Sequence, residues 1–179
     1  MDPSEIKALA EKGYNAIKDC YNFNGNVIVS ALFIPNLGIA VGSKPRGIGV
    51  AGELLDMSHR ISNKAAHVSE WFQRYWELIE NRECVSNYES ESNEDLLHAE
   101  DVTIIKGTDK YLLQWSMKEW GDRLKFPKGS HMVSYGKYSL QGGTASTVGL
   151  KEPCGGMSLT KLTVPCKNVL GGLSITWSV

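Results

Sequence analysis

The chain has 179 residues, with 42% hydrophobic and 22% charged residues and a formal net charge of -1. This length and composition predict one soluble globular domain over residues 1–179. The near-zero net charge argues against electrostatic binding of nucleic acid over the whole protein surface, although a local basic groove is compatible with it. The longest apolar run, Val27–Ala40, is interrupted by Pro35 and Asn36, so we expect no segment that spans a membrane.

The beginning of the sequence is acidic and polar, because Asp2, Pro3, Ser4 and Glu5 follow Met1. It lacks the basic and then apolar pattern of a secretory signal peptide, so we expect a protein that acts in the cytoplasm. Specialised secretion systems deliver proteins without such a signal, and that route stays open.

The four cysteines stand at positions 20, 84, 154 and 166. A core of this size needs no disulfide framework, so each cysteine is judged separately. We interpret Cys20 and Cys84 as buried or incidental thiols. Cys154 and Cys166 each follow a proline directly, and this shared context sets them apart.

Three features are predicted in the first half of the chain. Residues 4–21 have apolar side chains at helical spacing and predict an N-terminal helix. Two apolar runs, at about 26–34 and 37–41, flank a Pro-Asn pair and indicate a β-hairpin. Because both runs are nearly continuous, we expect helices on both faces of these strands. Residues 51–82 have a long helical pattern, which we interpret as a helical insertion.

The second half alternates helical and strand-like segments. We expect helices from near 93–95 to about 106, at 109–124 and at 167–170, strands at 132–140 and 173–177, and a Gly- and Thr-rich loop at 141–157. His131 lies in a Gly-Ser-His-Met tetrapeptide that cleaved purification tags commonly leave, so we discount it as a functional residue.

One ordered set of residues has the chemistry of a zinc site. His98 and Glu100 flank an alanine near a predicted helix start, and Cys154 and Cys166 follow. Catalytic zinc takes three His, Cys or carboxylate ligands and keeps one position for water, while a carboxylate off the metal moves protons. His98 and Glu100 are roughly 200° apart on an ideal helix, so they converge only at its first turn. Cys166 at the start of a helix would be favoured as thiolate.

This set resembles the cytidine-deaminase-like superfamily, whose members have H-[A/C]-E on one helix and P-C-x-x-C at the start of the next. The predicted hairpin, helix, strand, helix and strand have the same order, and the end of the chain is similar to the bacterial toxin-type branch. The resemblance implies a three-layer α/β/α sandwich around a mixed sheet that opens with an antiparallel hairpin. One departure is the cysteine spacing, since Cys154 and Cys166 are twelve positions apart. An insertion over 155–164 would have to loop out between them.

The resemblance implies a zinc-dependent hydrolytic deaminase that acts on an amino-bearing nucleobase, cytosine rather than adenine. His98, Cys154 and Cys166 would hold Zn²⁺, with Cys84 as the reserve candidate if Cys154 fails, and Glu100 would move protons. Substrate contacts are expected just past the second hairpin strand, at Ser43, Lys44 and Arg46. The substrate would be a nucleic acid or a nucleotide, and a toxin of this branch would have an immunity protein as partner. The alternative is a non-catalytic deaminase-like or zinc-stabilised module that binds another protein.

Overall fold

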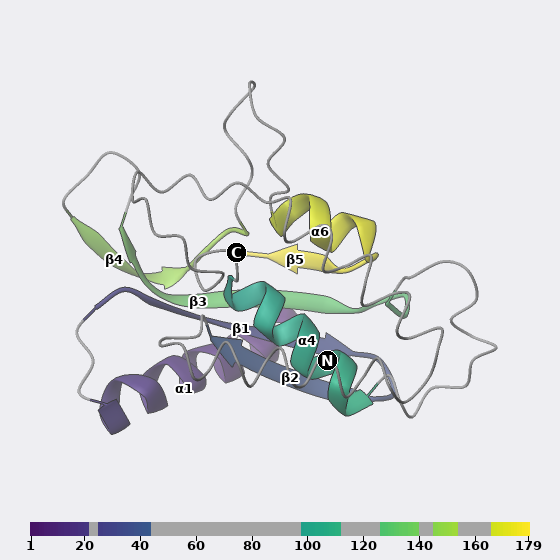
Figure 1. Cartoon of the computed structure of the whole chain (residues 1–179), viewed down its shortest axis with the longest axis horizontal. Helices are drawn as coiled ribbons and strands as arrows, with labels where there is room; N and C mark the ends of the chain where they lie inside the picture. Colours follow the sequence, from purple (N-terminus) through teal and green to yellow (C-terminus); the bar gives the residue numbers. More distant parts are fainter. Residues whose placement is uncertain (22–24, 44–97, 112–125, 140–144, 154–165) are drawn as a thin grey trace, which may run out of the picture.

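The computed structural model of the chain describes residues 1–21, 25–43, 98–111, 126–139, 145–153 and 166–179. The predicted helical insertion at 51–82 lies outside these residues. The elements in chain order are α1 (Pro3–Tyr21), β1 (Val27–Ile34), β2 (Gly38–Ser43), α4 (Ala99–Tyr111), β3 (His131–Ser139), β4 (Ser146–Leu150), α6 (Cys166–Gly172) and β5 (Thr176–Ser178). They form a mixed α/β structure with one five-stranded sheet (Figure 1).

The sheet begins with the predicted hairpin. β1 pairs antiparallel with β2, and Asn36 in the turn has the positive φ of 63° that asparagine tolerates. β1 also pairs antiparallel with β3, so β1 and β3 are the inner strands of the order β2-β1-β3-β4. The other edge of β3 is shared. β4 pairs antiparallel with its second half, and β5 pairs parallel with its first three residues.

Helix α1 packs on one face of this sheet. Ile6, Ala10 and Tyr14 recur every fourth residue and are buried, as expected for one face of an amphipathic helix. Ile6 and Ala10 pack against Ala31 of β1 and Val133 of β3. Burial of a side chain such as Ile6 contributes about 1.5–3 kcal/mol, so this face accounts for much of the stability of the contact.

Helix α4 packs on the opposite face. The α-carbon of Gly107 lies so close to the sheet that an added β-carbon would be 3.3 Å from side-chain atoms of Ala40 and Ile34. These side chains point away from α1, because neighbouring residues of a strand alternate between its two faces. Helices therefore contact β1 from both sides, which explains why its sequence is almost continuously apolar.

Several element boundaries differ from the sequence prediction. α4 begins at Ala99, later than the predicted start near 93–95, and it continues to Tyr111, where the sequence predicted a break after about 106. The predicted loop at 141–157 contains strand β4, because residues 146–150 pair with β3. The last strand begins at Thr176 and not at Leu173, because Leu173 and Ile175 still bond back to α6 through their backbone N–H groups.

Strand β5 is attached to β3 by side chains as well as by backbone. His131, at the start of β3, bonds Thr176 Oγ1 through Nδ1 at 2.8 Å and Ser178 Oγ through Nε2 at 2.9 Å. Met132, the next residue, is fully buried. The last two residues of the tetrapeptide that resembles a tag remnant, His131 and Met132, are thus the first residues of the central strand.

Candidate metal centre

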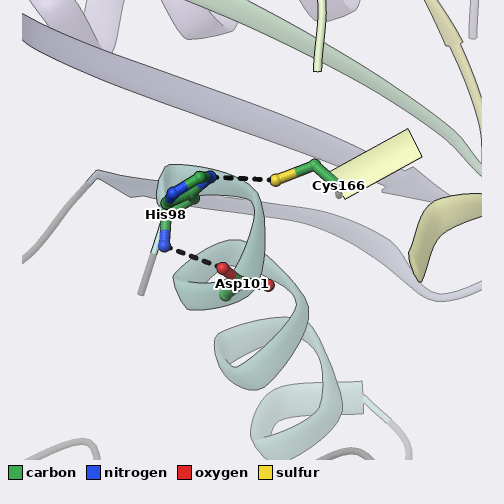
Figure 2. Close-up of side chains that lie close together, drawn as sticks. All are labelled: His98, Asp101 and Cys166. Carbon is green, nitrogen blue, oxygen red and sulfur yellow. Dashed lines mark hydrogen bonds between the residues drawn. The ribbon is translucent and has the colours of Figure 1, made fainter. Parts of the chain in front are cut away.

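His98 caps helix α4 from the position directly before it. Its backbone N–H donates to Asp101 Oδ2 at 2.7 Å, and its carbonyl oxygen accepts from the N–H of Val102 at 3.2 Å (Figure 2). A carboxylate three residues into a helix that bonds back to the capping residue is half of a capping box. This pair explains why the helix begins at Ala99.

Cys166 is the first residue of α6, as the preceding proline predicted. Its side chain is buried, and Val169 and Leu170 bury the same side of this short helix. Its Sγ lies 3.1 Å from Nδ1 of His98, so residues 68 positions apart in the chain meet at the starts of two helices (Figure 2).

Lys167, the next residue, contacts side chains of two other segments of the chain. Its Nζ lies 2.8 Å from Oε2 of Glu152 and 4.8 Å from the ring centre of Trp177 in β5. Glu152 stands two residues before Cys154 in the chain. The salt bridge therefore links the segment that leads to Cys154 with the residue next to Cys166.

His98, Asp101 and Cys166 form a group that could hold a metal ion, because their ligand atoms all lie within 4.8 Å of one another. Tetrahedral zinc with bonds of about 2.0–2.1 Å to nitrogen and 2.3 Å to sulfur would place these two ligand atoms about 3.5 Å apart. The distance between His98 Nδ1 and Cys166 Sγ, 3.1 Å, fits such an ion after a small movement.

Asp101 was missed by the sequence analysis. The available signal was its position three residues after His98, the spacing of a capping box.

Glu100 points into the protein beside this group. It is 3% exposed, and its Oε1 accepts a hydrogen bond of 3.2 Å from Oγ of Ser134 in β3. Among the described residues, the group of possible ligands consists of His98, Asp101 and Cys166 and does not include Glu100. Because His98 precedes the helix, the two residues of the H-x-E motif both lie at its start despite their angular separation.

The other predicted site residues are placed only in part. Ser43 is half-buried at the end of β2, directly after Gly42, whose α-carbon abuts the backbone of Thr103 in the first turns of α4. Ser43 thus lies near the start of α4, and its proposed contact with substrate stays a prediction. Lys44, Arg46, Cys154 and the reserve candidate Cys84 lie outside the described residues.

No protein-family model, curated protein or solved structure matches the chain. Of the helices in the described ranges, none has the length and apolar character needed to span a bilayer.

Proposed function

We propose that the chain is a zinc-dependent deaminase of the cytidine-deaminase-like superfamily that hydrolyses the amino group of a nucleobase, cytosine rather than adenine. One observation carries the proposal. His98 and Cys166 meet at the starts of α4 and α6, at an Nδ1 to Sγ distance of 3.1 Å, with Glu100 buried in the first turn of α4. This arrangement supports two proposed metal ligands, His98 and Cys166, and one proposed proton carrier, Glu100, at the starts of these two helices.

The order of the elements supports the same family. The hairpin β1–β2 is followed by α4 with the H-x-E motif, then by β3, and then by α6 with Cys166 and by β5, which is parallel to β3. α1 and α4 lie on opposite faces of the sheet. Strand β4, between β3 and α6, is not part of the predicted order. The remaining order and the helices on both faces support our proposal of a three-layer α/β/α sandwich.

The donor set suits zinc, which binds both imidazole nitrogen and thiolate sulfur. His98 would bind through Nδ1, the nitrogen that faces Cys166. Cys154 remains our proposed third ligand, supported by the salt bridge between Glu152 and Lys167 that joins its segment to the start of α6. When bound, zinc would lower the pKa of a coordinated water towards neutrality.

The protein's own groups would carry the remaining chemistry. Glu100 takes a proton from the attacking water and gives it to the ring nitrogen beside the amino-bearing carbon. It then takes the second proton from the hydroxyl group formed on that carbon and gives it to the departing amine. Water is consumed and ammonia is released, so the reaction needs no other reactant. Burial of Glu100 keeps bulk water from this proton. Ser43, Lys44 and Arg46 are the proposed substrate contacts.

The biological setting of this activity is proposed from the sequence resemblance. A toxin-type deaminase would act on nucleic acid or nucleotide in the cytoplasm of a target cell, and its producer would hold a cognate immunity protein. The net charge of -1 is compatible with either a free nucleotide or a strand bound in a local groove.

The proposal is tested by metal content together with turnover. The purified chain should hold about one zinc. It should release ammonia from at least one of cytidine, deoxycytidine and single-stranded DNA or RNA that contains cytosine, with adenine counterparts assayed in parallel. Glu100→Gln should lower the rate by at least about a hundredfold and keep the zinc, because Glu100 moves protons and does not bind metal. Glu5→Gln, at an exposed position on α1, is the matched control.

Two results would contradict this assignment. A protein purified gently without chelators that holds no zinc removes the metal centre. A Glu100→Gln variant that loses its zinc, or that keeps most of the activity, removes the proposed role of Glu100.

A second candidate function is a metal-stabilised module that binds another protein. Asp101 favours it, because its carboxylate lies within 4.8 Å of the ligand atoms of His98 and Cys166. If Asp101 and Cys154 both joined those two residues, four protein ligands would close the site and leave no position for water, as in structural zinc sites.

A further inference from the structure

A row of small residues crosses the sheet beneath the first turns of α4. Gly42 of β2, Ser30 of β1 and Ser134 of β3 are direct partners in the strand register. A β-carbon on Gly42 would lie 2.8 Å from Oγ1 of Thr103, so the helix approaches the sheet as closely as the row allows. The beginning of α4, with Glu100, is therefore held directly over the two serines.

The two serine hydroxyls form a buried chain that ends at Glu100. The Oγ atoms of Ser30 and Ser134 are 2.7 Å apart, and Oγ of Ser134 is 3.2 Å from Oε1 of Glu100. The exposed fractions of Ser30, Ser134 and Glu100 are 0%, 2% and 3%. A serine hydroxyl has one hydrogen, and an ionised carboxylate only accepts. Ser134 therefore donates to Glu100, and Ser30 donates to Ser134.

Thr103 holds the same region from the helix side. Its hydroxyl lies 3.1 Å from the carbonyl oxygen of Ser30 and 2.7 Å from that of Ala99. It thereby ties the strand residue that supports Ser134 to the residue that precedes Glu100. Buried hydroxyl groups are costly unless they are bonded. Here Thr103 bonds two backbone carbonyl oxygens, and the chain of the two serines ends at the Glu100 carboxylate.

We propose that Ser134 is the positioning residue of Glu100, and this inference rests on the proposed deaminase function. Its hydrogen bond occupies Oε1 of Glu100 and so makes Oε2 the oxygen that takes and delivers the proton. A carboxylate without this bond would rotate about its last torsion, and either oxygen would face the reacting atoms. The Oγ of Ser134 bonds Ser30 and Glu100, and Ser134 is not in the group of possible metal ligands, so its role would be exerted through Glu100.

The inference predicts a specific kinetic change. Ser134→Ala should lower kcat about tenfold, because proton transfer depends on the placement of Glu100. KM and the zinc content should stay near those of the unchanged protein, since no substrate or metal contact is removed. A merely structural serine would instead change the amount of folded, zinc-loaded protein and leave the kcat of that fraction unchanged.

Three further variants make the test specific. Ser134→Cys nearly keeps the shape but offers only a weak S–H donor, so it should behave like Ser134→Ala even if the alanine variant folds poorly. Ser134→Thr keeps the hydroxyl and should restore most of kcat. Ser130→Ala is the matched control, because Ser130 is also fully buried, directly before β3, and its Oγ has no hydrogen-bond partner within the described part of the chain.

The assay uses cytidine and a single-stranded oligodeoxynucleotide with one cytosine, with kcat, KM, zinc content and thermal unfolding measured for each variant. A fall in kcat for Ser134→Ala and Ser134→Cys, with recovery in Ser134→Thr, supports the inference. A kcat of Ser134→Ala equal to that of Ser130→Ala overturns it while leaving the deaminase proposal intact. A zinc-loaded, unmodified protein without turnover of any base overturns the proposed function and this inference with it.

Discussion

At the scale of single residues, the meeting of His98 and Cys166 is the feature on which the proposed function depends. The motif His98-x-Glu100 and the proline before Cys166 could be identified from the sequence, and the structure brings these residues to two adjacent helix starts. Asp101, Ser30 and Ser134 were not identified. Asp101 had only the capping-box spacing from His98, which indicates a helix start and not a metal ligand. Two isolated serines in apolar strands become informative only when the strand register makes them partners.

The identity of the third metal ligand is the sharpest question at this scale. We expect Cys154→Ser and Cys166→Ser to lose the zinc, and Cys20→Ser and Cys84→Ser to keep it. Asp101→Asn should keep about one zinc per chain, because an asparagine oxygen still accepts the N–H of His98 and preserves the cap. Metal analysis of these five variants after gel filtration measures the result.

Two other results are informative. Loss of zinc from both Asp101→Asn and Cys154→Ser would indicate a closed site with four protein ligands and would favour the structural module. Loss from Asp101→Asn with retention in Cys154→Ser would show that His98, Asp101 and Cys166 are the ligands, so the prediction for Cys154 would be wrong.

At the scale of elements, the approach of α4 to β2 places the start of the helix. Gly42→Ala should lower the free energy of unfolding by about 1–3 kcal/mol, because the new β-carbon would meet Oγ1 and the backbone nitrogen of Thr103 at 2.8 and 2.9 Å. Displacement of α4 should also weaken zinc binding through His98. Denaturant unfolding and zinc titration measure both effects.

Gly149→Ala is the control for that substitution. Gly149 lies in β4, and a β-carbon there would meet nothing within 4 Å. Its replacement should leave stability and zinc affinity almost unchanged. Equal destabilisation by the two alanines would mean that the close contact between β2 and α4 is not what makes Gly42 necessary.

At the scale of the whole molecule, we expect His131 to make the free energy of unfolding depend on pH, because it attaches the C-terminal strand. Burial holds the pKa of His131 below its ordinary value. The bonding pattern favours a neutral ring, because Thr176 Oγ1 donates to the carbonyl oxygen of Ser130 and is left to accept from Nδ1, while Ser178 can donate to Nε2.

The unfolded chain therefore binds a proton more readily than the folded protein in the pH range just below about 6.5. The free energy of unfolding should fall as the pH is lowered through this range, because lower pH stabilises the state that binds more protons, which is the unfolded chain. A His131→Gln variant should lose this component, so the difference in stability between the two proteins should shrink from about pH 7.5 to about pH 5.5. Parallel stability curves, measured by denaturant unfolding in chelator-treated protein, would show that His131 does not contribute.

The sequence by itself determined the amphipathic helix at the N-terminus, the hairpin and the central strand, and it indicated His98, Glu100 and Cys166 as candidate site residues. These features depend on local periodicity, turn residues and short motifs, which act between neighbours in the chain. Only the tertiary structure decided that Cys166 faces His98, that Asp101 is the third member of the group, and that Glu100 rests on Ser134. The contact of Cys166 with His98 joins residues 68 positions apart, and that of Glu100 with Ser134 joins residues 34 positions apart. The start of α4 lies over a row of small strand residues. Strand register and helix docking create this proximity, and neither is encoded in the spacing of any single motif.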